Sequence, residues 1–382
     1  MTDQQPTPET DDLPEQMQVR REKRTRLLDS GVDAYPMVVE RTHTIKEIVE
    51  THDAEALGAD VQTGEIVAIT GRVIFLRNTG KLCFVRLREG DGSEIQAMLS
   101  LAEVGEERLA DFKALVDIGD LLQVKGEVIT SRRGELSVQA TEWAMAAKTL
   151  RPLPNEHRPL SDEARIRLRY VDMMIRKEPR DLVRIKAAVL KSLRSTLDDQ
   201  GYLEVETPIL QLTNGGAAAR PFKTHLNALD QPMLLRIALE LDLKRAMIGG
   251  VDKVFEIGRT FRNEGLDSTH AAEFSMLEAY QAYGDQFTMM QLTRDLVVNA
   301  ARAVGRTVVP ARDGTEIDLE APWRQAAIFD LVSEALGEVV DVNTEESVLR
   351  NHAASRSVEL KKDWGAAEIV VELYEQLVED SL

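Results

Sequence analysis

Two neighbouring stretches of the chain carry side chains that could bind a nucleotide. In VFEIGRTFRNE, strand alternation places a glycine and three charged residues on one face, namely Glu256, Gly258, Arg262 and Glu264. The opposite face is apolar and is expected to be buried, with Phe255, Ile257 and Phe261. An arginine fixed on a strand can stabilise the negative charge that develops on a phosphate during a reaction.

The second stretch, EFSMLEAY, places an aromatic ring, a carboxylate and a phenol on a single face, with Phe274, Met276, Glu278 and Tyr280. Between the two stretches lies GLDSTHAA, a loop that contains His270 and is long enough to cover phosphates. The same residues could instead form a structural network of salt bridges. Spacing alone leaves both interpretations open.

A third group of candidate residues lies earlier in the chain. In KLCFVRLR, alternation places Phe84 on a polar face with Arg86 and Arg88, opposite an apolar face. Gln96 and Glu135 fall on the polar faces of later strands. A ring among cations is suited to stacking a base while the cations meet phosphates, and an amide and a carboxylate can read base edges. The alternative for Phe84 is burial under a neighbouring segment.

The elements that must hold these residues follow from hydrophobic periodicity. Between Glu65 and Met145 the pattern predicts three strands, a helix and two more strands, which is the order of an OB-fold barrel. Further along, IKAAVLKSLRSTLDDQG predicts an amphipathic helix that ends at Gly201. Later strands and helices do not alternate regularly, so the predicted fold class is α+β with an antiparallel sheet in the second half.

Composition shifts divide the chain into four predicted parts. Residues 1–62 are a disordered tail and a basic N-terminal helical segment, and residues 63–147 are the OB-fold domain. Residues 148–160 form a linker rich in proline, and residues 161–382 form the second domain.

Composition also limits the class of protein. The 382 residues are 43% hydrophobic, and no apolar run approaches the roughly 20 residues that span a bilayer. We therefore expect a cytoplasmic protein without a membrane segment. The single cysteine, Cys83, excludes an intrachain disulfide and a cysteine-based zinc site. The net charge of -18 argues against nucleic-acid binding, but local basic clusters at residues 20–26 and 132–133 weaken that argument; a solvated helix and turn are the alternative.

Several motifs are similar to those of class II aminoacyl-tRNA synthetases. Residues 261–264 (FRNE), continuing through His270 to Phe274, resemble their motif 2. Residues 201–208 (GYLEVETP) resemble motif 1, whose proline, here Pro208, lies at the dimer interface of the family. Residues 215–222 (GGAAARPF) are similar to the amino-acid-binding loop of bacterial lysyl-tRNA synthetases. The similarity runs along nearly the whole chain, so we expect an anticodon-binding OB-fold followed by a class II catalytic domain.

The resemblance implies a role for each matching residue. Arg262 would hold the ATP α-phosphate and the lysine carboxylate, and three further residues would contact the adenine amino group, the outer phosphates and the adenine ring: Glu264, His270 and Phe274. The lysine ammonium would be received by Glu240, Glu278 and Tyr280, and Gly216 would let the backbone approach the substrate. The anticodon would be read by Phe84, Gln96 and Glu135.

The implied substrates and partners are ATP, L-lysine, a lysine tRNA and a second copy of the chain in a homodimer. The family also uses Mg²⁺, but no residue of this sequence is assigned as its ligand. The sequence departs from the family at Leu239 and Ala272, where proline is usual, and at Asp242, where an aromatic residue is usual. We expect these departures to affect rigidity more than substrate identity.

The last departure concerns motif 3. Family members continue beyond a stretch like VVELYEQLVEDSL with acidic magnesium ligands and a glycine-rich GxGxGxER motif, which this sequence does not contain. The catalytic domain is therefore expected to be C-terminally incomplete, and the 382-residue chain to have little adenylation activity. Two functions remain open, a lysine-tRNA ligase that forms lysyl adenylate and transfers it to tRNA, or a truncated pseudo-synthetase that binds tRNA or dimerises.

Overall fold

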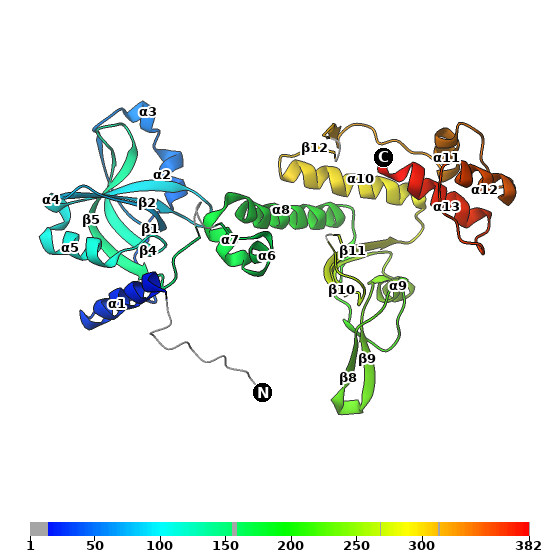
Figure 1. The fold of residues 1–382 in the computed structure, drawn as a ribbon, viewed down its shortest axis with the longest axis horizontal. Helices are drawn as coiled ribbons and strands as arrows, with labels where there is room; N and C mark the ends of the chain where they lie inside the picture. Colours follow the sequence, from blue (N-terminus) through cyan, green and yellow to red (C-terminus); the bar gives the residue numbers. More distant parts are fainter. Residues whose placement is uncertain (1–13, 155–158, 268, 312–313, 382) are drawn as a thin grey trace. The chain divides into compact units, whose positions relative to one another are not determined.

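The computed structural model describes residues 14–154, 159–267, 269–311 and 314–381. The chain divides into two compact units, residues 1–187 and 188–382 (Figure 1). The predicted disordered tail up to residue 13 lies outside the described residues, as does the part of the predicted linker at residues 155–158.

The first unit contains a closed five-stranded barrel with the strand order β1-β2-β3-β5-β4. Its strands are β1 (Gln62–Asn78), β2 (Leu82–Arg88), β3 (Glu94–Ser100), β4 (Leu121–Thr130) and β5 (Leu136–Ala147). Helices α4 (Leu101–Val104) and α5 (Glu106–Leu115) lie between β3 and β4 in the chain. This is the predicted order of three strands, a helix and two strands, so the OB-fold prediction is confirmed.

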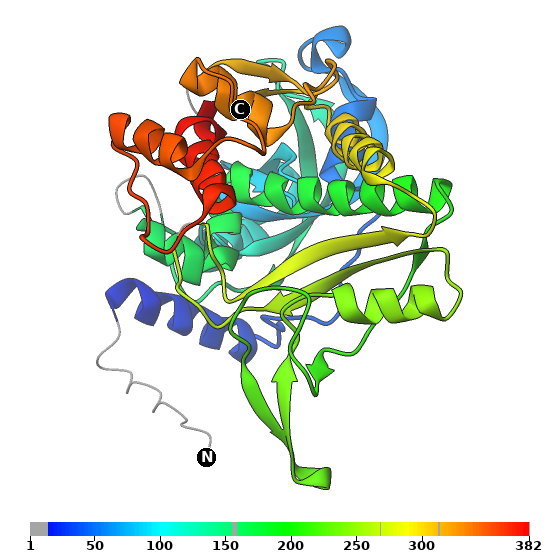
Figure 2. The ribbon, with the colours of Figure 1, turned by 90° about the vertical axis from the view of Figure 1, so that its right-hand side faces the viewer.

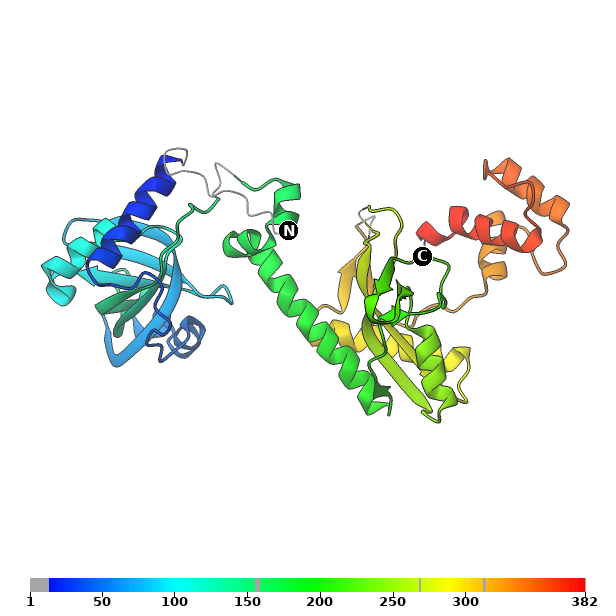
Figure 3. The ribbon, with the colours of Figure 1, turned by 90° about the horizontal axis from the view of Figure 1, so that it is seen from below.

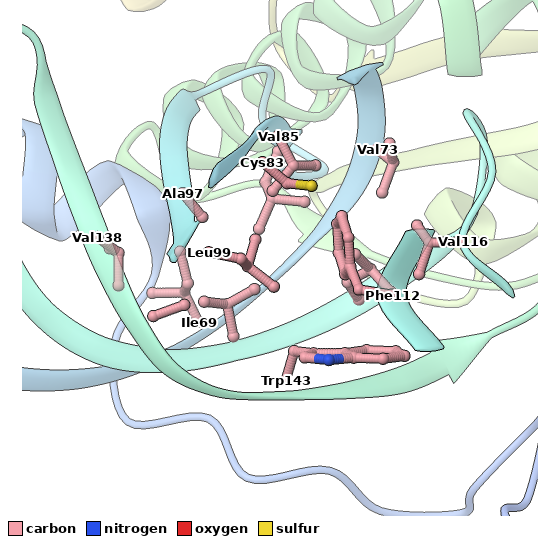
Figure 4. Packing of buried hydrophobic residues seen from close by; sticks show 14 of the residues in the cluster. Ile69, Val73, Cys83, Val85, Ala97, Leu99, Phe112, Val116, Val138 and Trp143 are labelled. Carbon is pink, nitrogen blue, oxygen red and sulfur yellow. The ribbon is translucent and has the colours of Figure 1, made fainter. Parts of the chain in front are cut away.

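The barrel interior is filled by the apolar side chains that alternation assigned to it. Cys83, Val85, Ala97, Leu99 and Val138 are all buried and point inward (Figure 4). Phe112 of α5 and Trp143 of β5 meet edge to face, with ring centroids 5.4 Å apart. Strand alternation therefore leaves the intervening polar residues on the outer face.

From residue 14 on, three helices precede the barrel in the chain: α1 (Glu15–Asp29), α2 (Ile45–Thr51) and α3 (Ala54–Leu57). The basic residues of α1 attach the helix to the barrel domain. Arg20 donates to the carbonyls of Ile118 and Thr149, and the Lys23 ammonium lies 2.6 Å from Asp117 Oδ1. The cluster is thus partly engaged within the protein, which neither of the two sequence interpretations anticipated.

Helices α6 (Asp162–Arg167), α7 (Arg169–Ile175) and α8 (Lys177–Asp199) follow the barrel in the chain. The predicted amphipathic helix is the second part of α8. The second unit contains a three-stranded sheet in the order β11-β10-β6, made of β10 (Lys253–Phe261), β11 (Glu273–Gln281) and β6 (Leu203–Glu204). Strands β10 and β11 are antiparallel as predicted, but β6 pairs with β10 in parallel, so the sheet is mixed.

Helices cover both faces of this sheet (Figure 2). On one face, Leu197 of α8 and Leu292 of α10 (Gln286–Ala303) pack with Phe255. On the other face, Leu239 and Leu243, at the start and in the middle of α9 (Glu240–Ile248), pack with residues of β10 and β11. Met276 and Tyr280, from the candidate face of β11, belong to the core on the α9 side.

The rest of the second unit, as far as the structure describes it, consists of two small sheets and a helical cluster. One sheet has the order β7-β9-β8, with β7 (Leu210–Gln211), β9 (Gln231–Leu235) and β8 (Lys223–Leu226), and β12 (Val308–Pro310) pairs with β13 (Glu316–Asp318). Helices α11 (Ile328–Leu336), α12 (Glu346–Ser355) and α13 (Ala366–Leu377) pack around their own apolar core (Figure 3). Within the described residues, no helix is long and apolar enough to cross a membrane.

Candidate functional site

The face that alternation predicted for β11 exists and lies on the α9 side of the sheet. In the β10–β11 ladder Phe274 is opposite Thr260, Glu278 is opposite Glu256, and Tyr280 is opposite Val254. Met276 and Tyr280 pack with the core around α9. The ring, the carboxylate and the phenol therefore follow one another along a single face.

Arg262 follows the last residue of β10 and faces the Phe274 ring. Its backbone N–H donates to the carbonyl of Ala272 at 3.0 Å, which extends the pairing of the two strands by one step. Its guanidinium carbon lies 5.2 Å from the centroid of the Phe274 ring, and Nε donates to the carbonyl of Ile237 at 3.4 Å. A cation and a ring that could stack a base are thus held next to each other by the β10–β11 hairpin.

Glu264 lies in the exposed loop beyond Arg262 and contacts the segment 215–222. The backbone N–H of Arg220 donates a hydrogen bond to Glu264 Oε1 at 3.3 Å. The Asn263 N–H donates to the Arg220 carbonyl at 2.8 Å. The predicted amino-acid-binding loop and the motif 2 loop are therefore neighbours. The carboxylate remains on the surface, where a second donor can reach it.

His270 is exposed and is oriented by Asp267. The His270 Nδ1 lies 2.8 Å from Asp267 Oδ2, so the imidazole presents its Nε2 away from the carboxylate. Hydrogen bonds from Thr269 and from His270 hold the pKa of the Asp267 carboxyl well below its usual range. Asp267 is therefore ionised and holds the ring so that Nε2 faces away from the carboxylate, as contact with phosphate oxygens requires.

Glu278 accepts two hydrogen bonds in the candidate lysine site. The Leu239 N–H donates to Oε1 at 3.0 Å, and the Tyr280 hydroxyl donates to Oε2 at 2.8 Å. Burial, together with the bond to Glu278, raises the pKa of the Tyr280 phenol well above its usual range. Leu239 therefore affects the site directly, because proline at this position has no N–H to donate. Leucine in place of the family's proline at residue 239 thus adds a hydrogen bond to Glu278, whereas the sequence predicted an effect on backbone rigidity.

A side-chain ammonium already lies beside two of the residues predicted to receive lysine. The Nζ of Lys244 is 2.6 Å from Glu240 Oε1 and 5.7 Å from the centroid of the Tyr280 ring. Gly216 lies against the same helix start: its φ is +86°, and an added Cβ would come within 3.0 Å of the Cβ atoms of Ala238 and Glu240. A residue other than glycine would push the 215–222 loop away from Glu240.

Glu256 does not belong to an open charged face, contrary to the sequence prediction. It is buried and paired with Arg236 at 2.8 Å, and its other oxygen accepts the hydroxyl of Thr207 at 2.5 Å. For this residue the structural salt bridge was the correct interpretation. Arg236 itself was missed, although a lone arginine inside the apolar strand MLLRIA was a usable signal, since a buried charge requires a partner.

Arg236 and Glu256 connect the segment before Pro208 to β10. Arg236 donates to the carbonyl of Thr207 at 3.0 Å and to the carbonyl of Arg259 at 2.8 Å. Pro208 itself lies directly after Thr207, between β6 and β7. The motif 1 segment is thereby fixed to the strand that ends at Arg262.

The described residues offer no obvious metal site. No group of three or more His, Cys, Asp or Glu side chains among them is arranged to hold a metal ion. The only cysteine, Cys83, is buried in the barrel, and burial raises the pKa of its thiol.

On the barrel, the three candidate anticodon residues lie on one outer face. Arg86 pairs in register with Gln96 across β2 and β3, and its guanidinium forms an ion pair with Glu135. The Gln96 amide donates to Ser137 Oγ at 3.0 Å. Phe84 is partly exposed, two residues before Arg86 on β2. The sequence located the ring, the amide and the carboxylate, but it did not reveal that Arg86 links two of them.

A cavity of about 430 Å³ opens beside this face. Its lining includes Arg86, Gln96 and Glu135 from the barrel, and His52 and Val49 from the α2 region. The cavity is therefore bounded by polar groups with both donors and acceptors, which suits the edge of a base.

Two families match this chain. Residues 161–363 match the family described as tRNA synthetases class II (D, K and N), and residues 51–146 match the OB-fold nucleic acid binding domain. These ranges contain the sheet site of the second unit and the outer face of the barrel, respectively.

Curated relatives cover nearly the whole chain. A lysine-tRNA ligase of Mycolicibacterium gilvum is 50% identical over 375 residues, which cover 97% of this chain and 74% of that protein. Lysine-tRNA ligase 1 of Mycobacterium tuberculosis is 48% identical over 379 residues, covering 97% of this chain and 75% of that protein. The lysine-tRNA ligase of Kineococcus radiotolerans is 49% identical over 379 residues, which cover 99% of this chain and 75% of that protein. By this similarity and by its two family matches, the chain belongs to the class II lysine-tRNA ligases.

Proposed function

We propose that the second unit of this chain activates L-lysine with ATP and that its barrel binds the anticodon of a lysine tRNA. The observation that supports this most directly is the contact between the Arg262 guanidinium, just after β10, and the Phe274 ring of β11, the strand that also carries Glu278 and Tyr280. A cation for phosphate, a ring for adenine and acceptors for an ammonium are the groups that adenylation of lysine requires.

In the proposed reaction the lysine carboxylate attacks the α-phosphorus of ATP, and pyrophosphate leaves. Negative charge builds up on the α-phosphoryl oxygens, and Arg262 would stabilise it more strongly in the transition state than in the ground state. Phe274 would stack on the adenine, Glu264 would accept a hydrogen bond from the adenine amino group, and His270 would contact the outer phosphates.

The substrate ammonium would be received by Glu240, Glu278 and Tyr280. An ammonium that leaves water needs charged or hydrogen-bonding partners, and two carboxylates supply them. Lys244 supports this part of the proposal, because its own ammonium lies beside Glu240 and the Tyr280 ring. Bound lysine would then compete with Lys244 for Glu240.

Mg²⁺ is expected of the family, but the described residues do not gather a ligand set for it. We therefore assign it no residue. The chain spans about three quarters of the length of the curated relatives that it matches. Their similarity favours the ligase over the alternative of a pseudo-synthetase, which gains no support from these relatives.

On the barrel, Phe84 would stack a base of the anticodon, and Gln96 and Glu135 would read base edges. The open outer face and the adjoining cavity support this assignment. We also propose that two copies associate around Pro208, and that the protein works in the cytoplasm, as the family resemblance implies.

The test is calorimetric binding of a non-hydrolysable lysyl-adenylate analogue, which requires no turnover. The wild-type chain should bind it, and Arg262→Ala should weaken binding roughly 10- to 100-fold, because a charge-assisted hydrogen bond to the phosphate mimic is lost.

The matched control is Arg259→Ala. Arg259 is exposed on β10, three residues before Arg262, and its Nε lies 3.6 Å from Glu273 Oε1, so its loss should leave affinity unchanged. Undetectable binding by the wild type, or equal affinity of wild type and Arg262→Ala, would contradict the proposed function.

A further inference from the structure

Phe75 is exposed on the outside of the barrel although the alternation of β1 directs it inward. Ile69, Gly71 and Val73 are buried, and the next position in that alternation is residue 75. The register between β1 and β2 shifts between Val73 and Phe75, so that Val73 pairs with Leu87 and Phe75 with Arg86. Ile74 is the extra residue of this β-bulge.

After the bulge, odd-numbered residues of β1 face outward and even-numbered residues face the barrel core, the reverse of the arrangement before it. Leu76 now packs against the barrel core, whereas the Phe75 side chain is 51% exposed. A bulge gives up a regular pairing of strands, and bulges are frequent where a side chain must be redirected at a functional site. A single exposed apolar residue is common on protein surfaces. Whether Phe75 has a binding role therefore depends on the residues around it.

Those neighbours belong to the proposed anticodon surface. Phe75 is opposite Arg86, which is in turn opposite Gln96 and bonded to Glu135. Phe84 is opposite Arg77, the residue two positions beyond Phe75 on β1. Phe75 and Phe84 are thus diagonal neighbours on one face of two paired strands.

The separation of the two rings fits two bases that do not stack on each other. Diagonal positions on paired strands lie about 7–8 Å apart, whereas stacked bases follow one another at about 3.4 Å. Proteins recognise single-stranded RNA by splaying bases apart and stacking each on an aromatic ring. A loop that places one base on Phe84 therefore brings the next base within reach of Phe75.

We infer that Phe75 is a second base-stacking residue of the anticodon surface and holds the base next to the one on Phe84. This inference rests on the proposed binding of tRNA by the barrel. Arg86, between the two rings and the base-reading amide, would keep the intervening RNA backbone close to the sheet.

The experiment is a titration of fluorescently labelled lysine tRNA with wild type, Phe75→Ala, Phe75→Leu and Phe75→Trp. Loss of a stacked base should weaken binding roughly 5- to 100-fold in the alanine variant. Leucine keeps apolar area without a ring and should be nearly as weak, while tryptophan keeps a ring and should bind close to wild type.

Ile66→Ala is the matched control. Ile66 is on the same strand, opposite Glu127, and is 56% exposed, so it tests the loss of exposed apolar area away from the two rings. Its affinity should equal that of the wild type. The slope of log affinity against log salt should be unchanged in all Phe75 variants, because stacking releases no counterions.

Phe84→Ala separates failure of this inference from failure of the proposed function. If Phe84→Ala weakens binding but Phe75→Ala does not, or if Phe75→Leu binds as wild type, Phe75 is not a stacking residue. If neither alanine variant has an effect, the anticodon function of the barrel is itself wrong. The double variant should show the product of the two fold-losses, and a loss no greater than that of Phe84→Ala alone would mean that the rings do not hold separate bases.

Discussion

Tyr280 is the residue whose protonation can be tested most directly. Its hydroxyl donates to Glu278, and burial and this bond raise the pKa of the phenol above its usual range. Because the folded state keeps the proton and the unfolded state loses it above pH 10 or so, this residue stabilises the fold below that pH, and the contribution is lost as pH rises further. Tyr280→Phe should therefore reduce the fall in unfolding free energy between pH 9 and about 10.5.

Urea unfolding of both proteins at the two pH values measures this difference. Tyr202 is also buried, and its pKa is raised for that reason, so part of the fall should remain in the variant. An identical fall in Tyr280→Phe and wild type would show that the Tyr280 phenol titrates normally.

Single residues were predictable from sequence where alternation alone decides their position. Phe84, Gln96, Phe274 and Glu278 lie on the faces that a two-residue period assigns. Glu256 was misjudged because the same period cannot distinguish an exposed charge from a buried ion pair, and its partner Arg236 is distant in the chain. The exposure of Phe75 was not predicted for a different reason. A β-bulge reverses the two-residue period, and no residue in VIFLRN signals a bulge.

At the scale of elements, one lysine links the end of the barrel's last strand to the segment before β4 and, through Asp117, to α1. Lys148, directly after β5, donates to Asp120 at 2.7 Å and to Asp117 at 2.6 Å, and Asp117 also binds Lys23 of α1. The side chains of Lys148 and Asp120 are both 0% exposed. Removing the lysine would leave a buried carboxylate without its charge partner.

Lys148→Ala should lower the unfolding free energy of the barrel by about 3–5 kcal/mol. Lys125→Ala, which removes the exposed pair with Glu40, should cost at most about 1 kcal/mol. Denaturant titrations of the two variants and the wild type compare the costs. If the two costs were equal, the Lys148 network would be no more than a surface interaction.

The elements themselves were predicted unevenly. The barrel strands are long and strongly alternating, and their order was evident from the sequence. Within the motif 1 stretch, which the sequence identified by resemblance, just Leu203–Glu204 pair as a strand, β6. The reason is local: Thr207 gives its N–H and hydroxyl to Glu256, and Pro208 has no N–H to give.

At the scale of the whole molecule, the strand edges near Pro208 are the surface on which the proposed dimer can be tested. In the described part of the second unit, β6 is the last strand of its sheet beside β10, and β7 is the last strand of its sheet beside β9. Apolar side chains on this segment are strongly exposed, with Leu203 at 60% and Leu212 at 61%. Exposed edges with apolar residues favour association, and a two-fold dimer pairs the same surface of both copies.

Leu203→Asp and Leu212→Asp should therefore shift the protein from dimer to monomer in sedimentation velocity at micromolar concentration. Each aspartate would place a charge in an interface that buries both copies of the leucine, so the effect is doubled by symmetry. The matched control is Val339→Asp, because Val339 is 86% exposed in the connection between α11 and α12, away from the motif 1 segment in the chain. It should remain dimeric. A wild-type protein that sediments only as a monomer would refute the interface, and dissociation by Val339→Asp alone would move it to the helical cluster.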